Sequence, residues 1–156
     1  GQMLDVYRQG VADLKSYAPV DPLPSYVPNS IPEDGFILIS PKHHQFLNSG
    51  YANFNLENGQ ANQQIVMINN IDAKAHEIAD FDKMKIWNEL GEIEATAKVS
   101  EDVLSGILVV HHGFWRRHVK GNTVNALIRN NPSKIGQGIT VNDTIVFMKK
   151  KSIRER

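Results

Sequence analysis

Glycine, tryptophan and carboxamide side chains are concentrated between residues 112 and 127. The segment contains His112-Gly113-Phe114-Trp115 at its start, Gly121-Asn122 in its middle and Asn125-Ala126-Leu127 at its end. An aromatic side chain can stack on a flat ring, glycine lets the backbone approach closely, and carboxamides form hydrogen bonds without adding charge. These residue types favour binding of a flat polar heterocycle, which indicates a large organic cofactor rather than a self-contained catalyst.

Two interpretations are open for the side chains of this segment. Trp115 could be an ordinary core residue or a partly exposed stacking wall. Carboxamides could be turn residues, or they could read the edges of a ring; the candidates are Asn48, Asn122, Asn125 and Gln137. A basic cluster near His118 could be a solvated loop or could neutralise a pyrophosphate; its members are Arg116, Arg117 and Lys120.

Other chemistries have little support. The histidines include two adjacent pairs, His43-His44 and His111-His112. Neighbours on an extended chain point to opposite faces, so neither pair alone can chelate one ion, and no HExxH or Cys/His pattern occurs. We therefore expect scattered, hydrogen-bonding histidines and no metal bound within this chain. Neither a GxSxG elbow nor a glycine-rich phosphate loop is present, although residues 136–138 (GQG) are a weak hint.

Composition narrows the function classes. The chain has 156 residues, no cysteine and a formal net charge of zero. Zero net charge argues against nucleic acid or an acidic membrane as the main partner, and no apolar stretch approaches the roughly 20 residues that span a bilayer. Without cysteine, this chain cannot form disulfides, ligate iron–sulfur clusters or use thiol catalysis.

Apolar runs and alternating patterns predict a β protein with few helices. Residues 36–39, 65–68, 107–110 and 144–147 are short apolar runs typical of buried strands. Residues 83–86 and 92–99 alternate between apolar and polar side chains and predict a hairpin, with Gly91 at a left-handed bulge position. Asn70 is expected to cap a short helix over residues 71–76. Such strands in one compact unit suggest a closed barrel.

Prolines are concentrated near the beginning of the chain. Five of the seven prolines fall between residues 19 and 32, which excludes a helix or a central strand there. We expect residues 1–34 to be a proline-rich entry arm packed on the barrel, residues 35–150 to form the barrel and residues 151–156 to be a basic tail. The whole would be a single domain, and the arm makes it look excised from a larger enzyme.

Six motifs, in their order along the chain, resemble the C-terminal domain of the dimethyl sulfoxide reductase superfamily, the domain that binds molybdopterin guanine dinucleotide. The motifs cover residues 22–26 (PLPSY), 39–49 (ISPKHHQFLNS), 68–73 (INNIDA), 97–106 (AKVSEDVLSG), 113–127 and 136–138 (GQG). The resemblance implies a mainly β fold, a six-stranded double-psi β-barrel with a few short flanking helices.

The resemblance also implies two walls of a cofactor site. By position, the first wall would contain Ser40, Lys42, His43, His44, Asn48 and Ser49. The second wall would contain Gly113, Trp115, Asn122, Asn125, Gln137 and Gly138. Asn125 is the leading candidate for a pterin contact, because the family pattern offers an asparagine two places before the leucine.

Redox chemistry would lie outside this chain. The resemblance implies that the molybdenum or tungsten is ligated by another domain, so the isolated domain would be non-catalytic and would bind, orient and tune the cofactor. The parent enzyme would transfer an oxygen atom or two electrons. Its partners would be upstream domains of the same polypeptide, with an iron–sulfur electron-transfer subunit as a further candidate. A cytoplasmic or periplasmic location would depend on an upstream twin-arginine signal.

One departure from the family pattern supports a second hypothesis. The usual G-I-x-D-G-D turn reads EIADFD at residues 77–82, so Glu77 and Phe81 replace both glycines. That turn must adopt backbone angles open to Glu77 and Phe81. The missing glycines favour an alternative, a free-standing double-psi barrel that acts as an adaptor for a protein partner. A guanine-nucleotide titration would separate the two, because an adaptor would show no shifts at Asn48, Trp115 or Asn125.

Overall fold

The computed structural model describes most of the chain from residue 30 onward. The described residues are 26, 28, 30–44, 46–48, 50–51, 63–133 and 138–151. The chain consists of two units: residues 31–129 with 141–156 form the barrel unit, and residues 1–30 with 130–140 form the second. Most of the expected entry arm, most of the basic tail and part of the loop before residue 63 lie outside the described residues.

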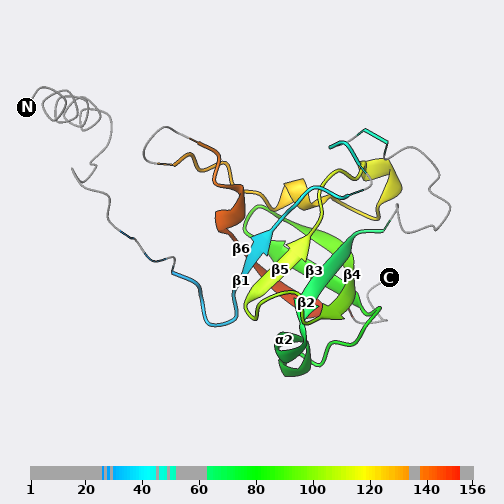
Figure 1. The fold of residues 1–156 in the computed structure, drawn as a ribbon, viewed down its shortest axis with the longest axis vertical. Helices are drawn as coiled ribbons and strands as arrows, with labels where there is room; N and C mark the ends of the chain where they lie inside the picture. The colour runs from blue at the N-terminus through cyan, green and yellow to red at the C-terminus, as the bar shows by residue number, and fades with distance from the viewer. Residues whose placement is uncertain are drawn as a thin grey trace, which may run out of the picture. The chain divides into compact units, whose positions relative to one another are not determined.

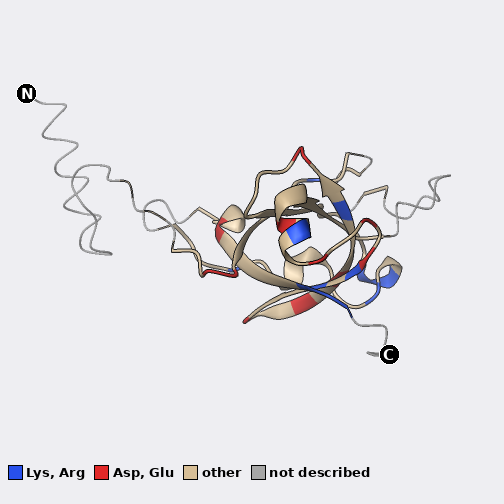
Figure 2. Cartoon of the chain, turned by 90° about the horizontal axis from the view of Figure 1, so that it is seen from below, with Lys and Arg blue, Asp and Glu red and all other residues tan. Residues whose placement is uncertain are grey.

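In the described part of the chain, six strands form a closed barrel (Figure 1). They are β1 (Phe36–Ile39), β2 (Ile65–Asn69), β3 (Lys83–Asn88), β4 (Gly91–Ser100), β5 (Ile107–Val110) and β6 (Thr144–Lys150). Neighbouring strands follow the order β1-β5-β2-β4-β3-β6 around the barrel. Seen along the barrel, the strands make a ring with charges of both signs spread around it (Figure 2). The predicted six-stranded double-psi barrel is confirmed.

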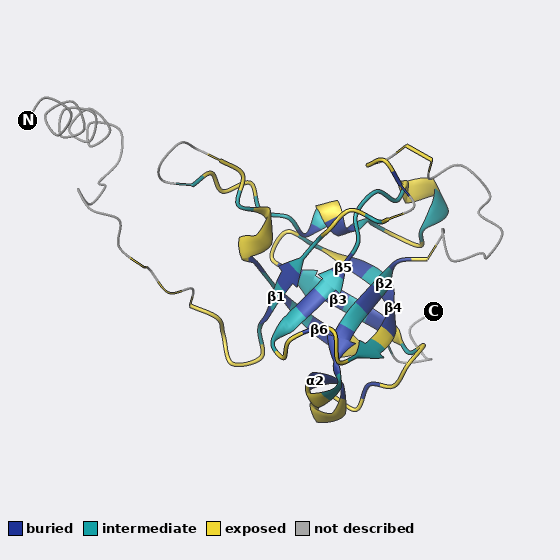
Figure 3. Cartoon of the chain, viewed as in Figure 1, coloured by how far each residue is buried: buried dark blue, intermediate teal, exposed yellow. Residues whose placement is uncertain are grey.

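Alternation along each strand builds the barrel core. In β1 the side chains of Phe36 and Leu38 are buried while Ile37 and Ile39 are half-buried, because successive side chains of a strand point to opposite faces. The same alternation is visible on the other strands (Figure 3). Ile68, Met84, Ile86 and Leu108 are among the side chains that are fully buried. Burying one such side chain contributes roughly 1.5–3 kcal/mol to folding.

Strand directions divide the barrel into two ends. β1 pairs with β5 in parallel and with β6 antiparallel, while β2 pairs with β4 in parallel and with β5 antiparallel. β3 is antiparallel to β4. Consequently β1, β3 and β5 end where β2, β4 and β6 begin, and we call this the loop end. The opposite end, where helix α2 (Asn70–Ala75) follows β2, is the helix end (Figure 1).

The N-cap of α2 is Asn69, so the prediction of Asn70 was wrong by one residue. Asn69 has extended backbone angles, and its side chain accepts a 2.8 Å hydrogen bond from the Ile71 N–H. Its amide also donates to the Val103 carbonyl at 2.6 Å. The Asn70 amide instead donates to the Glu101 carboxylate. None of the described helices combines the length and apolar composition that crossing a bilayer requires.

The turn after α2 keeps left-handed backbone angles without glycine. Glu77 has a φ of 54° and Phe81 a φ of 68°. The aspartates of the turn hold it in place: Asp80 accepts a hydrogen bond from the Val99 N–H at 2.6 Å, and Asp82 accepts one from the Ala79 N–H at 2.8 Å. The expectation that this turn would adopt backbone angles open to Glu77 and Phe81 was wrong, because both residues have positive φ angles, a region that favours glycine.

Gly91 does not occupy a left-handed bulge, contrary to prediction. Among the described glycines, positive φ angles occur at Gly106, Gly113 and Gly121. Gly91 is instead a site of close approach, because a β-carbon there would lie 3.1 Å from the Ala126 carbonyl oxygen. Gly91 is therefore constrained by a neighbouring segment rather than by its own backbone angles.

Candidate functional site

The segments that follow β1 and β5 lie side by side at the loop end. His112 donates its backbone N–H to the Pro41 carbonyl at 3.0 Å, and His43 donates to the His112 carbonyl at 3.3 Å. Lys42 and His112 form a parallel bridge, which continues the β1–β5 pairing beyond both strands. The His112 Nδ1 lies 2.8 Å from the Ser40 carbonyl oxygen. Parallel pairing thus brings the first predicted wall next to the second.

Gly113 is a point of close approach between the two walls. Its φ is +111°, and a β-carbon there would lie 2.5 Å from the Asn48 carbonyl oxygen and 3.1 Å from the Phe46 ring. Asn48 itself has a φ of 53°, a conformation that asparagine tolerates better than most residues. Only glycine combines this backbone angle with this contact.

A cluster of histidine and phenylalanine rings lies next to this contact. The His43 ring stacks on His44 with centroids 4.8 Å apart, and lies 4.6 Å from the Phe46 ring. It also contacts His111 at 5.4 Å and Phe114 at 5.6 Å, both edge to face. The expectation of scattered histidines with adjacent pairs pointing apart was wrong here, because residues 43 and 44 lie in a turn rather than an extended strand.

Burial lowers the pKa values of two of these histidines, so that their imidazole rings stay neutral at a lower pH than free histidine. The pKa of His43 is lowered by desolvation and then by the nearby His44 and His111. Desolvation also lowers the pKa of His111, with further contributions from His44, His112 and Lys98. Neutral imidazoles can donate and accept hydrogen bonds, which suits the recognition of an uncharged ring. Among the described residues, no group of three or more His, Asp or Glu side chains could hold a metal ion.

Trp115 and the basic cluster continue the second wall. The short 3-10 helix η2 (Arg116–His118) follows Trp115 directly. The Arg117 guanidinium lies 5.0 Å from the centre of the Trp115 ring, a cation–π contact, and the tryptophan is 42% exposed. Lys120 is highly exposed and lies 3.9 Å from the Glu94 carboxylate. Trp115 is therefore a partly exposed side chain with arginine beside it, rather than a core residue.

Asn125 is presented outward by a second 3-10 helix, η3 (Val124–Ala126). Val124 and Leu127 are buried in the barrel core, whereas Asn125 is exposed. Positions three apart share a face in a 3-10 helix, so the two apolar side chains anchor this segment while the asparagine between them faces away. Asn48 follows β1, and Trp115 and Asn125 follow β5, so all three belong to segments that leave the barrel at the loop end.

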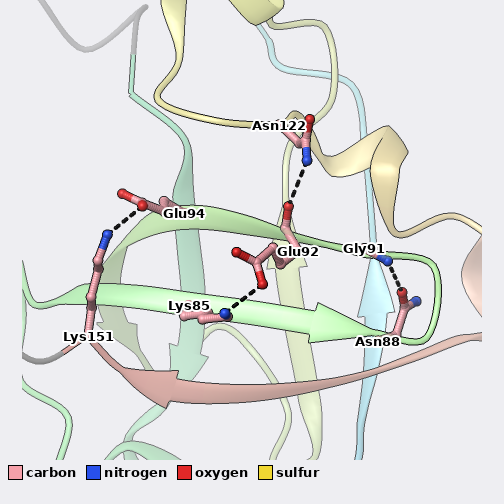
Figure 4. Close-up of polar contacts among 7 residues, drawn as sticks. All are labelled: Lys85, Asn88, Gly91, Glu92, Glu94, Asn122 and Lys151. Atoms are coloured by element: carbon pink, nitrogen blue, oxygen red, sulfur yellow. Dashed lines mark hydrogen bonds and ion pairs between the residues drawn. The ribbon is translucent and has the colours of Figure 1, made fainter. Parts of the chain in front are cut away.

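The remaining predicted residues have different surroundings. Asn122 donates its amide to the Glu92 carbonyl at 3.3 Å, so part of its hydrogen-bonding capacity holds the loop to β4 (Figure 4). Gly138 belongs to the second unit, where its N–H donates to the Ser133 hydroxyl at 2.9 Å. Ser49 and Gln137 lie outside the described residues.

Two buried polar side-chain atoms among the described residues are unsatisfied, the Arg129 Nε and the Ser40 hydroxyl oxygen, and the second lies beside the meeting point of the two walls. The Ser40 hydroxyl oxygen is buried, and it has no hydrogen-bond partner within the part of the chain that the structure describes. An unmade hydrogen bond at a buried hydroxyl costs about 1–3 kcal/mol. Such a group at the meeting point of two loops fits a site whose polar partner is supplied by a ligand.

Sequence reasoning missed several residues that build the site. Phe46 and Phe114 pack the cluster around His43, and Gln64 and Asn88 hold the segment that carries Asn125. Phe114 had a signal, since it lies inside the glycine and tryptophan segment. Gln64 and Asn88 had none, because their partners in the segment that carries Asn125 are 39 to 60 residues away in sequence.

Comparisons with known proteins identify the family of the chain. Residues 36–145 match the model of the family described as "Molydopterin dinucleotide binding domain". The chain is 38% identical over 120 residues to the "Probable oxidoreductase YoaE" of Bacillus subtilis, an alignment covering 76% of this chain and 18% of that protein. It is 26% identical over 165 residues to "Dimethyl sulfoxide reductase DmsA" of Escherichia coli, covering 94% of this chain and 20% of that protein. The chain thus spans about a fifth of the length of these relatives.

A solved structure supports the fold. The chain is similar to acetylene hydratase from Pelobacter acetylenicus with a TM-score of 0.72 and 12% identity, over 88% of this chain and 22% of that one. At this identity the likeness concerns the fold alone. The family match covers the whole barrel from β1 to the start of β6 and confirms the resemblance inferred from the six motifs. The chain belongs to the molybdopterin dinucleotide-binding domain family of the dimethyl sulfoxide reductases.

Proposed function

We propose that the loop end of the barrel is one side of a binding site for molybdopterin guanine dinucleotide in a molybdenum or tungsten oxidoreductase. The observation that carries the proposal is the contact of Gly113 with Asn48, beside the Ser40 hydroxyl that lacks a partner among the described residues. This contact brings the two predicted walls together. The unsatisfied hydroxyl supports a polar ligand group at that point.

The residues present fit such a cofactor. Ser40, Asn48 and Asn125 offer hydrogen-bonding groups for the edges of pterin or guanine rings, and Trp115 would stack on a ring face. The guanidinium groups of residues 116 and 117 would neutralise pyrophosphate, for which their planar fork is suited. The first wall further includes Lys42, His43 and His44, and the second includes Gly113 and Asn122.

In this proposal the domain orients the cofactor and does not perform the reaction. The bound cofactor supplies a metal centre for oxygen-atom or two-electron transfer, and another domain of the same polypeptide ligates the metal. Upstream domains are therefore the immediate partners, and an iron–sulfur subunit is a further one. The names of the relatives, an oxidoreductase and a dimethyl sulfoxide reductase, support this class of activity.

The adaptor alternative loses the feature that favoured it. Its support was the absence of glycine at residues 77 and 81, taken as a sign of relaxed constraint. Both residues nevertheless have the left-handed angles of the turn, and Asp80 and Asp82 hold it. The constraint on the turn is therefore intact, and cofactor binding is the function we retain.

Cofactor content of the full-length polypeptide tests the proposal. Asn125→Ala and Gly113→Ala are purified beside the unaltered protein and beside Asn70→Ala, a half-buried asparagine at the helix end whose amide donates to Glu101. Molybdenum or tungsten and acid-released guanine are measured per polypeptide. We expect Asn125→Ala to lower cofactor affinity by about tenfold through one lost hydrogen bond, and Gly113→Ala to lower it because the added methyl group displaces the Asn48 loop. Asn70→Ala should match the unaltered protein. Equal cofactor content in all variants would contradict the proposal.

A further inference from the structure

The segment carrying Asn125 lies along a strand edge that none of the described strands covers. β2 pairs with β4 only from Thr96 to Ser100, which leaves the first half of β4, from Gly91 to Ala95, without β2 as a neighbour. Unpaired strand edges expose backbone groups that need partners. The segment 122–127 lies against this edge, and its contacts involve two buried carboxamides.

Gln64 holds the beginning of this segment. It is 4% exposed and lies just before β2. Its amide nitrogen donates to the Asn122 carbonyl at 2.9 Å and to the Glu94 carbonyl at 3.2 Å. Its side-chain oxygen accepts from the Val124 N–H at 3.1 Å. One side chain thus joins β4, the start of β2 and the start of η3.

Asn88 holds the end of the same segment. It is 8% exposed at the tip of the β3–β4 hairpin, and its amide donates to the Leu127 carbonyl at 2.7 Å. Its side-chain oxygen accepts from the N–H groups of Leu90 and Gly91, which fixes the hairpin tip (Figure 4). Gly91 in turn leaves room for the Ala126 carbonyl, 3.1 Å from the place of a β-carbon.

These contacts hold the backbone that carries Asn125 in one place. Val124 and Leu127 close the barrel core, and the carboxamides of Gln64 and Asn88 bind the backbone at both ends of the segment. Buried hydrogen bonds of this kind are costly to lose and limit a loop to one arrangement. Asn125 then needs no reorganisation before it binds a ring, and preorganisation strengthens binding.

We infer that Gln64 and Asn88 are positioning residues for cofactor binding, which act through Asn125 by clamping residues 122–127 to the hairpin and to the start of β2. The inference rests on the proposed function, and it assigns to two buried carboxamides a role in cofactor affinity rather than in folding alone. Neither side chain contacts the cofactor in this scheme.

A double-mutant cycle in the full-length polypeptide tests the inference. Gln64→Met keeps the approximate length of the side chain but removes all three hydrogen bonds. The loss of bound guanine and metal during dialysis is followed for Gln64→Met, for Asn125→Ala and for the double variant. If Gln64 acts through Asn125, Gln64→Met should speed cofactor loss by about tenfold alone and have little further effect in the Asn125→Ala protein.

A matched control separates positioning from folding. Asn69 is a buried carboxamide with two hydrogen bonds at the helix end, so Asn69→Leu should lower stability while leaving cofactor retention unchanged. Equal cofactor loss in Asn69→Leu and Gln64→Met, or fully additive effects in the cycle, would overturn the inference. If Gln64→Met does not accumulate, Gly91→Ala displaces Ala126 without removing a side-chain hydrogen bond, and it enters the same cycle.

The inference and the proposed function can fail separately. If Asn125→Ala and Gly113→Ala both retain cofactor fully, the proposed function is wrong. If Asn125→Ala loses cofactor while Gln64→Met retains it, the site stands and only the positioning role of Gln64 is wrong.

Discussion

Gly113 lies directly against the backbone carbonyl of Asn48, so that a β-carbon at position 113 would be 2.5 Å from that oxygen. Both residues have positive φ angles, 111° for the glycine and 53° for the asparagine. The contact joins the loop after β1 to the loop after β5, and it depends on the parallel pairing of these strands. Asn48 and Gly113, each with a positive φ angle, are therefore in contact at the point where the two proposed walls of the cofactor site meet.

Gly113→Ala should destabilise the protein more than an equivalent change elsewhere. Alanine at a positive φ costs roughly 1–2 kcal/mol, and the clash with Asn48 adds to that cost. Gly121→Ala is the control, because Gly121 has a φ of +81° with nothing within 4 Å of its β-carbon position. Urea unfolding should give a larger loss of unfolding free energy for Gly113→Ala. Equal losses would mean that the loop moves aside and that the contact is not tight.

The histidine cluster should make stability fall in mildly acidic solution. The folded-state pKa values of His43 and His111 lie below the ordinary value of 6.5, so the unfolded chain takes up protons first as the pH falls. Stability from these groups is complete above pH 6.5 and is lost as the pH falls towards their lowered pKa values. Urea midpoints between pH 8 and pH 5 measure this loss. Replacing His43 by phenylalanine should reduce it.

Glycine at position 77 or 81 should stabilise the protein. Glu77 and Phe81 hold left-handed angles that cost a residue with a β-carbon roughly 1–2 kcal/mol. Part of that gain is offset because glycine is more flexible in the unfolded chain, so we expect a net gain of about 1 kcal/mol for either change. Ala79→Gly is the control in the same turn, and it should destabilise. A loss of stability in Glu77→Gly would indicate that its side chain makes a compensating contact.

Local patterns in the sequence predicted the strands well. The alternation in β3 and β4 and the apolar run of β5 reflect a period of two that survives in the folded barrel. The cap of α2 was misplaced by one residue because Asn69 and Asn70 both suit an N-cap, and only the long-range hydrogen bond to Val103 favours the first. Gly91 was misjudged for a related reason, since its constraint comes from Ala126 and not from its own turn.

The candidate site was less predictable than the fold. Its wall residues came from a family resemblance, and the three-dimensional meeting of Asn48 with Gly113 has no local signature. The stacking of His43 on His44 depends on a turn that no periodicity marks. Gln64 reads as an ordinary polar residue before a strand, although it is buried and bonds to two distant segments. Contacts between residues far apart in sequence are set by topology, which one-dimensional patterns do not encode.

Asp72 offers a test in which stability and cofactor binding separate. Its buried carboxylate accepts hydrogen bonds from the Ser105 hydroxyl at 2.6 Å and from the Gly106 N–H at 2.8 Å, which ties α2 to the turn before β5. Asp72→Ala removes the acceptor for both donors and should cost about 2–3 kcal/mol of unfolding free energy, whereas Ser105→Ala removes one bond and should cost about 1 kcal/mol. These groups lie at the helix end, away from the loops that carry Asn48 and Asn125. Thermal unfolding should therefore show a larger loss of stability for Asp72→Ala than for Ser105→Ala. The guanine content of protein purified below its melting temperature should stay unchanged in both variants. A loss of guanine that parallels the loss of stability would show that the two ends of the barrel are coupled.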